Sequence, residues 1–328
     1  MRKPQVTKQD DRGERGVATA VRVMRCRNVS RWFTLLIAAC LLPAAARSQG
    51  AGKTGWSFLK LGVGGRAAGM AESFVAVAND PTATYWNPAG LQPDQGTMAV
   101  FSHHALLQDI RADFLAISFP AFRGAIGLGL NLQTIPGIER RITPAPEPIG
   151  LIDSRDLSLA LAYGHAINHR LQVGLTVKYL YEKIDVESAS GLAFDAGVLI
   201  KNLVDGLRLG AALQNLGSAG RLRHETIDLP ALARLGVAYV PAHLAGGALT
   251  LSSEAMILFG SQSSVSVAGE YVVQSALSLR GGYQFNRDNR GVAGGVGLQW
   301  GRYQLDYGYM PFASGLGDTH RFSLALKL

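Results

Sequence analysis

Cysteine is nearly absent from this chain. Its 328 residues include only Cys26 and Cys40, and both lie within the first 48 residues. The rest of the chain can therefore form neither a disulfide framework nor a reactive-thiol site, which excludes disulfide-stabilised domains and thiol enzymes. Stability must come from packing and backbone hydrogen bonds.

Long apolar runs are absent too. The run at residues 32–42, WFTLLIAACLL, has 11 residues, whereas a membrane-spanning helix needs about 20. Three arginines precede this run and the small-residue stretch PAAARS follows it, which is the layout of a secretory signal. We predict that residues 1–48 are a signal peptide, cleaved before Gln49, and that the chain is exported.

Two features of this leader lead to separate predictions. The residues before Met24 include three acidic side chains, which are unusual in the basic start of a signal, so we predict that translation starts at Met24. Acylation of Cys40, as in a lipoprotein, is the alternative to ordinary cleavage. The apolar run continues past the cysteine through Leu41 and Leu42, which favours ordinary cleavage.

An excess of either charge is missing from the predicted mature chain. Ten of the 32 Lys and Arg residues and three of the 24 Asp and Glu residues lie in the leader, which leaves 22 basic against 21 acidic side chains. No basic cluster with interleaved aromatic residues remains. We therefore predict no nucleic-acid partner.

What the chain has in abundance, from residue 97 onward, is apolar and polar alternation with a period of two. Segments of about ten residues follow one another between turn residues, as in transmembrane β-strands. The 14 candidate strands are residues 97–103, 113–121, 124–135, 156–166, 171–184, 191–202, 207–217, 231–240, 247–259, 263–273, 276–285, 291–300, 303–312 and 320–328.

The connections between these segments alternate in length. Short turns, such as those at residues 167–170 and 301–302, alternate with longer connections at residues 136–155, 185–190, 217–230 and 313–319. Short periplasmic turns with longer outer loops are typical of bacterial outer-membrane barrels. We predict an all-β fold, a transmembrane antiparallel β-barrel of about 14 strands over residues 96–328, in the cell outer membrane.

Alternation also assigns the two faces of each strand. In residues 171–182 the odd-numbered positions are apolar and suit lipid, whereas the even-numbered positions include Gln, Thr, Lys and Glu. An Arg or Lys facing lipid at mid-depth costs about 2–4 kcal/mol. The charges that fall on the lumen face are Lys178, Asp195, Lys201, Arg208, Arg234, Glu254, Glu270, Arg280, Asp306 and Arg321. We expect them to form ion pairs that fill the lumen, the alternative being an ion-selective lining.

The same alternation places aromatic residues on the outer face. Trp300, Tyr303, Tyr307 and Tyr309 are predicted to face outward and to anchor the barrel at the membrane interfaces. A secreted or lipid-anchored periplasmic β-module is the alternative fold. Its wet face should carry more Lys, Glu and Asn than the Gly and Ala found here.

The stretch before the first strand begins with a glycine pattern. Gly62, Gly64 and Ala67 match the loose dinucleotide pattern G-x-G-x-x-G/A. That site needs a buried strand before the glycines and a βαβ unit after them, and antiparallel alternation follows here instead. A nucleotide cofactor is therefore not predicted.

Residues 58–91, FLKLGVGGRAAGMAESFVAVANDPTATYWNPAGL, with the motif NPAG at their end, resemble the start of the PorV/PorQ family within the FadL-like group of outer-membrane proteins. The resemblance implies a 14-stranded barrel with an N-terminal segment folded into the lumen. It also implies a role in surface delivery of proteins, as in type IX secretion, or in transport of hydrophobic small molecules. Ala71 and Glu72 depart from the family, whose members often have small residues such as glycine there.

These considerations define a plug over residues 49–95. Glycines allow close backbone approach and positive φ, and an asparagine before proline can bridge a turn through its amide. The candidate plug or gate residues are Gly62, Gly64, Gly65, Gly69, Asn87, Pro88, Ala89 and Gly90. We expect the plug in the periplasmic half of the lumen. The alternative for the NPAG motif is a turn that leads into the first strand.

No enzyme signature is found. The nucleophile elbow G-x-S-x-G is absent, and the pairs His165 with His169 and His103 with His104 lack a third metal ligand or a shared face. We predict a non-enzymatic barrel without cofactor or metal. Its expected partners are outer-membrane lipid, the barrel-assembly machinery, and either secretion-system proteins or hydrophobic ligands.

Overall fold

The structure is a computed structural model that describes residues 55–141, 144, 147–222, 225–226, 228–241, 246–260, 263–287, 291–312 and 317–328. The predicted signal peptide, both cysteines and the first residues of the predicted plug lie outside the described residues.

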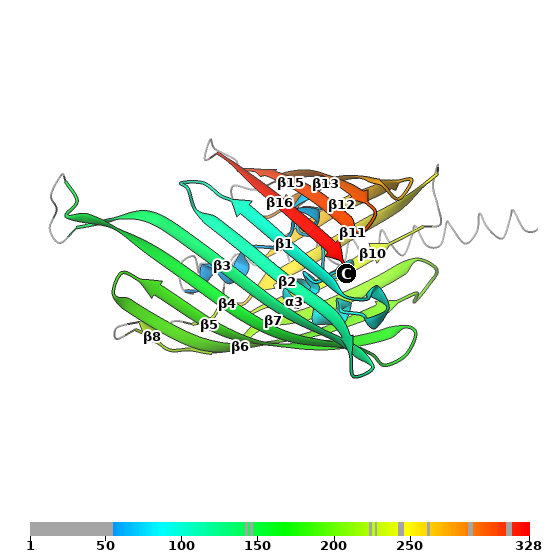
Figure 1. The fold of residues 1–328 in the computed structure, drawn as a ribbon, viewed down its shortest axis with the longest axis horizontal. Coiled ribbons are helices and arrows are strands. Elements are labelled where there is room, and N and C mark those ends of the chain that lie inside the picture. The colour runs from blue at the N-terminus through cyan, green and yellow to red at the C-terminus, as the bar shows by residue number, and fades with distance from the viewer. Residues whose placement is uncertain are drawn as a thin grey trace, which may run out of the picture. The chain divides into compact units, whose positions relative to one another are not determined.

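Fourteen strands of the described chain close into one antiparallel barrel, which confirms the predicted fold and strand number (Figure 1). Neighbours along the chain pair with each other, and β1 closes the ring against β16. The barrel strands are β1 (Met98–Ala105), β2 (Arg111–Ala121), β3 (Gly124–Arg140), β4 (Gly150–Ala166), β5 (Leu171–Ile184), β6 (Glu187–Lys201), β7 (Leu207–Ala219), β10 (Leu232–Tyr239), β11 (Gly247–Leu258), β12 (Ser264–Val273), β13 (Leu277–Phe285), β14 (Val292–Trp300), β15 (Tyr303–Pro311) and β16 (Asp318–Lys327). Between β7 and β10, β8 (Arg221–Leu222) and β9 (Glu225–Thr226) form a separate small ladder.

The outer wall is apolar because alternate residues of each strand point away from the lumen. One cross-strand row consists of Leu277, Leu298, Leu305, Leu324 and Phe101, and all five side chains are exposed. Apolar groups exposed around a closed barrel are stable in lipid and costly in water.

Polar and aromatic residues mark the two edges of this apolar wall. On the outer side, Arg111, Thr134, Arg155 and Lys183 form a continuous outward-facing cross-strand row. At the opposite ends of the strands, Trp300 and Tyr303 pair across β14 and β15 with 79% and 46% of their surfaces exposed. Tyr307 and Tyr309 share the outward side of β15, opposite Phe322 and His320 of β16. These aromatic side chains therefore face outward, as predicted, and their anchoring at the membrane interfaces stays a prediction.

The predicted long outer connections are largely β-structure. The connection at residues 136–155 shortens, because β3 continues to Arg140 and β4 starts at Gly150, and β6 already starts at Glu187. The ladder between β3 and β4 slips between Ile135 and Ile138. Pro136 and Gly137 interrupt the alternation there, as in a bulge, and so disguise the strand in the sequence. In Figure 1, β3 and β4 extend well beyond β1 and β16.

Residues 55–96 precede β1 and form short helical turns that are almost entirely buried. These are η2 (Ser57–Lys60), α2 (Gly65–Gly69), α3 (Ala83–Trp86), η3 (Pro88–Gly90) and η4 (Pro93–Gln95). None of the helices described here is long and apolar enough to cross a membrane. We refer to residues 55–96 as the plug, because its contacts run to the lumen face of the strands.

Candidate functional site

The plug is held by polar side chains that point into the lumen from strands on several sides of the barrel. Its backbone hydrogen-bonds to side chains of β11, β13 and β16, and its Asn87 side chain donates to the backbone of β6. The contacts are Gly65 N to Ser323 Oγ (3.0 Å), Ser252 Oγ to Ser73 O (3.1 Å), Gln284 Nε2 to Ala71 O (2.9 Å) and Asn87 Nδ2 to Val198 O (3.2 Å).

Glu254 of β11 is the most heavily used anchor. Its Oε2 accepts hydrogen bonds from the backbone N–H groups of Phe74 and Val75, each at 2.7 Å, and its Oε1 accepts from Arg234 Nη1 at 2.7 Å. Arg234 in turn lies 4.7 Å from the ring centre of Trp86. Both charged side chains are almost completely buried, so the ion pair depends on the plug for its surroundings.

A second network joins the plug to β12, β13 and β15. Arg66 of the plug makes two hydrogen bonds to Glu270, at 2.9 and 2.8 Å. Arg280 then bridges Glu270 and Asp306 with two contacts of 2.7 Å. Charges of both signs therefore neutralise one another inside the barrel, and water-facing charge is low in this part of the lumen.

A third network lies under Tyr85. Lys178 Nζ is 2.6 Å from Asp195 Oδ2 and donates to Asn215 Oδ1 at 2.9 Å. Asn215 has a φ of 59° and lies at a slip in the ladder between β6 and β7, which turns its side chain toward the pair. Burial raises the pKa of Tyr85 to about 12, so its hydroxyl stays protonated and donates to Leu59 O at 3.0 Å.

Two residues of the plug other than glycine occupy strained positions. Ala71 and Glu72 have φ values of 49° and 60°, in the left-handed region where glycine is favoured. The buried Glu72 carboxylate lies 3.2 Å from Arg321 and 3.4 Å from Arg287. These ion pairs hold the backbone in a conformation that costs about 1–2 kcal/mol for a residue with a Cβ.

Lys201 and Arg208 differ from the other predicted lumen charges. They are cross-strand partners, and within the described residues neither side chain makes an ion pair. Two cations therefore lie side by side at the ends of β6 and β7.

Close packing explains the predicted plug glycines. A Cβ on Gly62 would lie 2.5 Å from Glu72 Oε1, one on Gly65 2.7 Å from the Asp306 carbonyl oxygen, and one on Gly69 2.9 Å from Gly295 Cα. Gly64 instead needs its φ of 85°. The plug backbone therefore approaches the wall closely at α2.

The wall supplies a matching set of glycines that the sequence reasoning missed. A Cβ on these residues would meet plug atoms within 2.8 Å, and they occur at lumen-facing positions of nine strands. They are Gly127, Gly164, Gly174, Gly197, Gly210, Gly236, Gly282, Gly295 and Gly308. The repeated lumen-facing glycine was visible in the alternation, but alternation does not reveal what approaches it.

The NPAG motif lies against β4, β5 and β6. Asn87 is fully buried; its Oδ1 accepts from Ala89 N at 3.1 Å and its Nδ2 donates to Val75 O at 2.9 Å. Pro88 and Gly90 bound the helical turn η3, and Ala89 is fully buried. Asn87 thus bridges two parts of the plug and the wall, and η4 separates the motif from β1.

We predict that two glycine-to-alanine substitutions differ in their effect on stability. A Cβ at Gly197 would lie 2.1 Å from Asn87 Oδ1, so Gly197→Ala should displace the NPAG turn at a cost of about 1–3 kcal/mol. Gly281→Ala adds the same methyl group on the outer wall, where the nearest atom is 4.0 Å away, and should be neutral. Chemical unfolding of the two variants compares them; equal stability would contradict the close packing.

The plug extends further than predicted, because η2 reaches the outer ends of the strands. Ser57, Lys60 and Leu61 form the floor of a pocket of about 480 Å³. Its walls are mostly apolar and come from the outer ends of several strands and the connection between β1 and β2. They are Leu106, Leu107, Ile110, Gln133, Ile135, Met256, Leu258, Ser264, Asn286, Arg287 and Phe312. We refer to it as the outer pocket.

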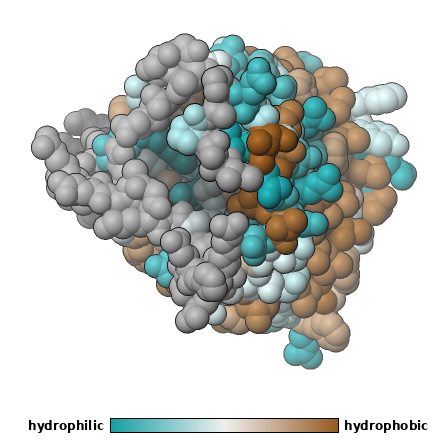
Figure 2. Space-filling view, turned by 90° about the vertical axis from the view of Figure 1, so that its left-hand side faces the viewer, coloured by the Kyte–Doolittle hydropathy of each residue, from teal (hydrophilic) through white to brown (hydrophobic). Residues whose placement is uncertain are grey.

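Figure 2 looks at the end of the molecule that faces left in Figure 1. Hydrophobic residues cover the outer wall, whereas hydrophilic residues gather around a hollow. Lys60 and Arg287 give the outer pocket a cationic edge, and burial together with the charge of Arg287 lowers the pKa of Lys60.

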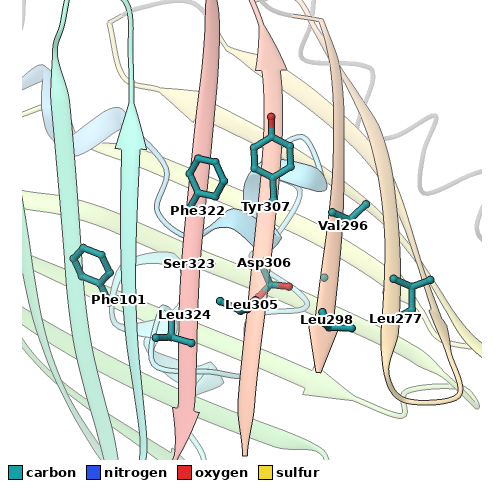
Figure 3. Close-up of a pocket in the computed structure, with 11 residues that line it drawn as sticks. Phe101, Leu277, Val296, Leu298, Leu305, Asp306, Tyr307, Phe322, Ser323 and Leu324 are labelled. Atoms are coloured by element: carbon teal, nitrogen blue, oxygen red, sulfur yellow. The ribbon is translucent and has the colours of Figure 1, made fainter. Parts of the chain in front are cut away.

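A second apolar cavity, of about 470 Å³, is a groove on the outer wall across β13–β16 and β1 (Figure 3). Phe322 and Tyr307 lie side by side at one end, and Leu298, Leu305 and Leu324 at the other. The groove opens toward lipid and is separated from the lumen by the strands themselves.

Comparison with known proteins was made for the whole chain. No family model matches it, and no curated relative does. Solved structures do match: a deletion mutant of the monoaromatic hydrocarbon channel TodX (11% identity, TM-score 0.56, 81% of this chain and 99% of that chain) and the toluene transporter TodX of Pseudomonas putida (13%, 0.52, 86% and 95%). A FadL homologue of Pseudomonas aeruginosa gives 14% identity and a TM-score of 0.51 over 80% of this chain and 97% of that chain.

At these identities the similarity is one of fold. The chain has a FadL-like architecture, a closed 14-stranded barrel with short helical segments before its first strand. A closed barrel with an apolar outer wall spans a bilayer without unpaired strand edges, and such barrels reside in the bacterial outer membrane. The chain is therefore an outer-membrane barrel.

Proposed function

We propose that this barrel is a channel for hydrophobic small molecules that are taken up at the outer pocket. The observation that carries the proposal is the pocket itself, a largely apolar cavity at the outer mouth of an otherwise polar and plugged lumen. A site of this size lined by apolar side chains with a few polar groups is typical of small-molecule binding. The FadL-like fold supports the same function.

The plug disfavours the alternative function, an open aqueous pore for polar solutes. A polar solute would have to displace the ion-pair networks of Glu254 and Glu270, whereas a hydrophobic molecule gains from leaving water as soon as it enters the outer pocket. Onward passage then requires movement of the plug or an opening between strands toward lipid. Lys60 and Arg287 provide a polar edge that would orient a ligand with an acceptor group.

The test places one negative charge inside the outer pocket and the same charge just outside it. Leu107→Asp introduces a carboxylate into the apolar wall and should weaken binding of a fluorescent apolar probe at least about tenfold, since an apolar ligand is poorly compatible with a desolvated charge. Gln108→Asp, at the exposed neighbouring position, should leave binding unchanged. Equal affinity of both variants and the unaltered protein would refute the outer pocket as the binding site.

A role in surface delivery of proteins is the second candidate. Its only support is the resemblance of residues 58–91 to the PorV/PorQ family. The decisive observation would be type IX secretion components encoded in the same genome, followed by loss of surface proteins when this gene is deleted.

A further inference from the structure

Two carboxylates face each other in the outer part of the lumen without a basic partner. Asp156 of β4 and Glu182 of β5 are direct cross-strand partners on the lumen side. Asp156 is only 6% exposed, yet its Oδ1 has no hydrogen-bond partner, and Glu182 Oε2 is likewise buried and unpartnered. Like charges directly opposite each other on adjacent strands destabilise a sheet.

This arrangement contrasts with the rest of the lumen. The buried carboxylates of Glu72, Asp195, Glu254, Glu270 and Asp306 each have a Lys or Arg nitrogen within 3.4 Å. Throughout the part of the chain that the structure describes, no Lys or Arg forms an ion pair with Asp156 or Glu182. The positive charge that accompanies every other buried carboxylate of this group is missing at this pair.

An uncharged side chain whose amide oxygen could coordinate a metal ion lies beside the two acids. Gln133 of β3 is the cross-strand partner of Asp156 on its other side and is 6% exposed. Gln133 also lines the outer pocket, so this row of side chains begins at the wall of a cavity that opens at the outer ends of the strands. Two carboxylates and an amide oxygen are ligands of the type that hard divalent cations prefer.

We propose that Asp156 and Glu182, with Gln133 beside them, bind a Ca²⁺ ion. The described residues contain no cluster of three or more His, Cys, Asp or Glu side chains that could hold a metal, so water molecules complete the six to eight ligands that Ca²⁺ takes. A site with so few protein charges has a dissociation constant on the order of 10⁻⁴–10⁻³ M, as in extracellular calcium modules. Calcium would tie β3, β4 and β5 together where they rise above the outer edge of the apolar wall.

The test compares thermal unfolding in CaCl₂ and in EDTA. Protein refolded from denatured chains is used, because lipopolysaccharide carried along from membranes would itself bind Ca²⁺. We expect millimolar Ca²⁺ to raise the unfolding midpoint of the unaltered protein and calorimetry to detect one site. The variant carrying Asp156→Asn and Glu182→Gln keeps the shapes of both side chains, and should be more stable than the unaltered protein in EDTA and insensitive to Ca²⁺.

A matched control removes a carboxylate elsewhere on the outer side. Asp109→Asn, at an exposed position between β1 and β2, should keep the full response to Ca²⁺. The proposal is overturned if the unaltered protein shows no response to Ca²⁺, or if the double variant responds as strongly as the unaltered protein. Stabilisation by mild acid alone, with no response to Ca²⁺, would show that the two acids share a proton instead.

Discussion

Replacing Glu254 with alanine is expected to lower the free energy of unfolding by about 3–5 kcal/mol, the size typical of breaking a buried ion pair from one side. The change leaves Arg234 buried without its carboxylate, and it removes the acceptor of the Phe74 and Val75 N–H groups. Because those two N–H groups belong to the plug, the variant should also have a more mobile plug. Denaturant unfolding followed by gel mobility and tryptophan fluorescence measures both effects.

Glu139→Ala is the matched control for this prediction. Glu139 also pairs with an arginine at 2.7 Å, but both side chains are at least one-third exposed at the outer end of β3. An exposed pair of this kind contributes about 0–1 kcal/mol. If the two variants lose similar stability, the buried network around Glu254 does not hold the plug.

The strands were predictable because a barrel wall imposes a simple rule. Lipid on one side and a polar lumen on the other force a period of two, which is visible in β5 as the alternation from Leu171 to Glu182. The rule failed at the register slip in β3. Pro136 and Gly137 interrupt the alternation there and suggested a loop, although β3 continues to Arg140.

The lumen was predictable in its residues and less so in its contacts. The alternation identified Glu254, Glu270 and Arg280 as lumen charges, but the pairing of Arg66 with Glu270 spans 204 residues of sequence. Such a contact depends on how the plug folds back, and no local pattern encodes it. The extent of the plug was also underestimated, since η2 reaches the outer pocket instead of staying in the periplasmic half.

Asp156 and Glu182 show a different limit of prediction from the sequence alone. Each residue alone has the appearance of an ordinary lumen-facing acid in an alternating strand. Their direct opposition follows from the register between β4 and β5, which the length of the turn at residues 167–170 determines. Only the register, together with the pairing of the other lumen acids, identifies the pair as unusual.

The largest functional effect is expected from removing most of the plug. Deletion of residues 60–83 takes away α2 and the segments bound by Glu254, Glu270 and Gln284. The Tyr85 hydroxyl donates a hydrogen bond to the Leu59 carbonyl oxygen at 3.0 Å, so the two sides of the deletion lie within the reach of one tyrosine side chain. The emptied lumen is polar and should fill with water as in a porin.

The measurement that tests this account most directly is single-channel conductance in planar bilayers, comparing the intact protein with the chain lacking residues 60–83. Heat-modifiable migration on gels establishes beforehand that both barrels are folded. We predict that the intact barrel conducts ions barely above the baseline and that the deletion opens a stable porin-like conductance. Equal conductance of the two folded proteins would mean that residues 55–96 do not close the lumen, and would contradict the account.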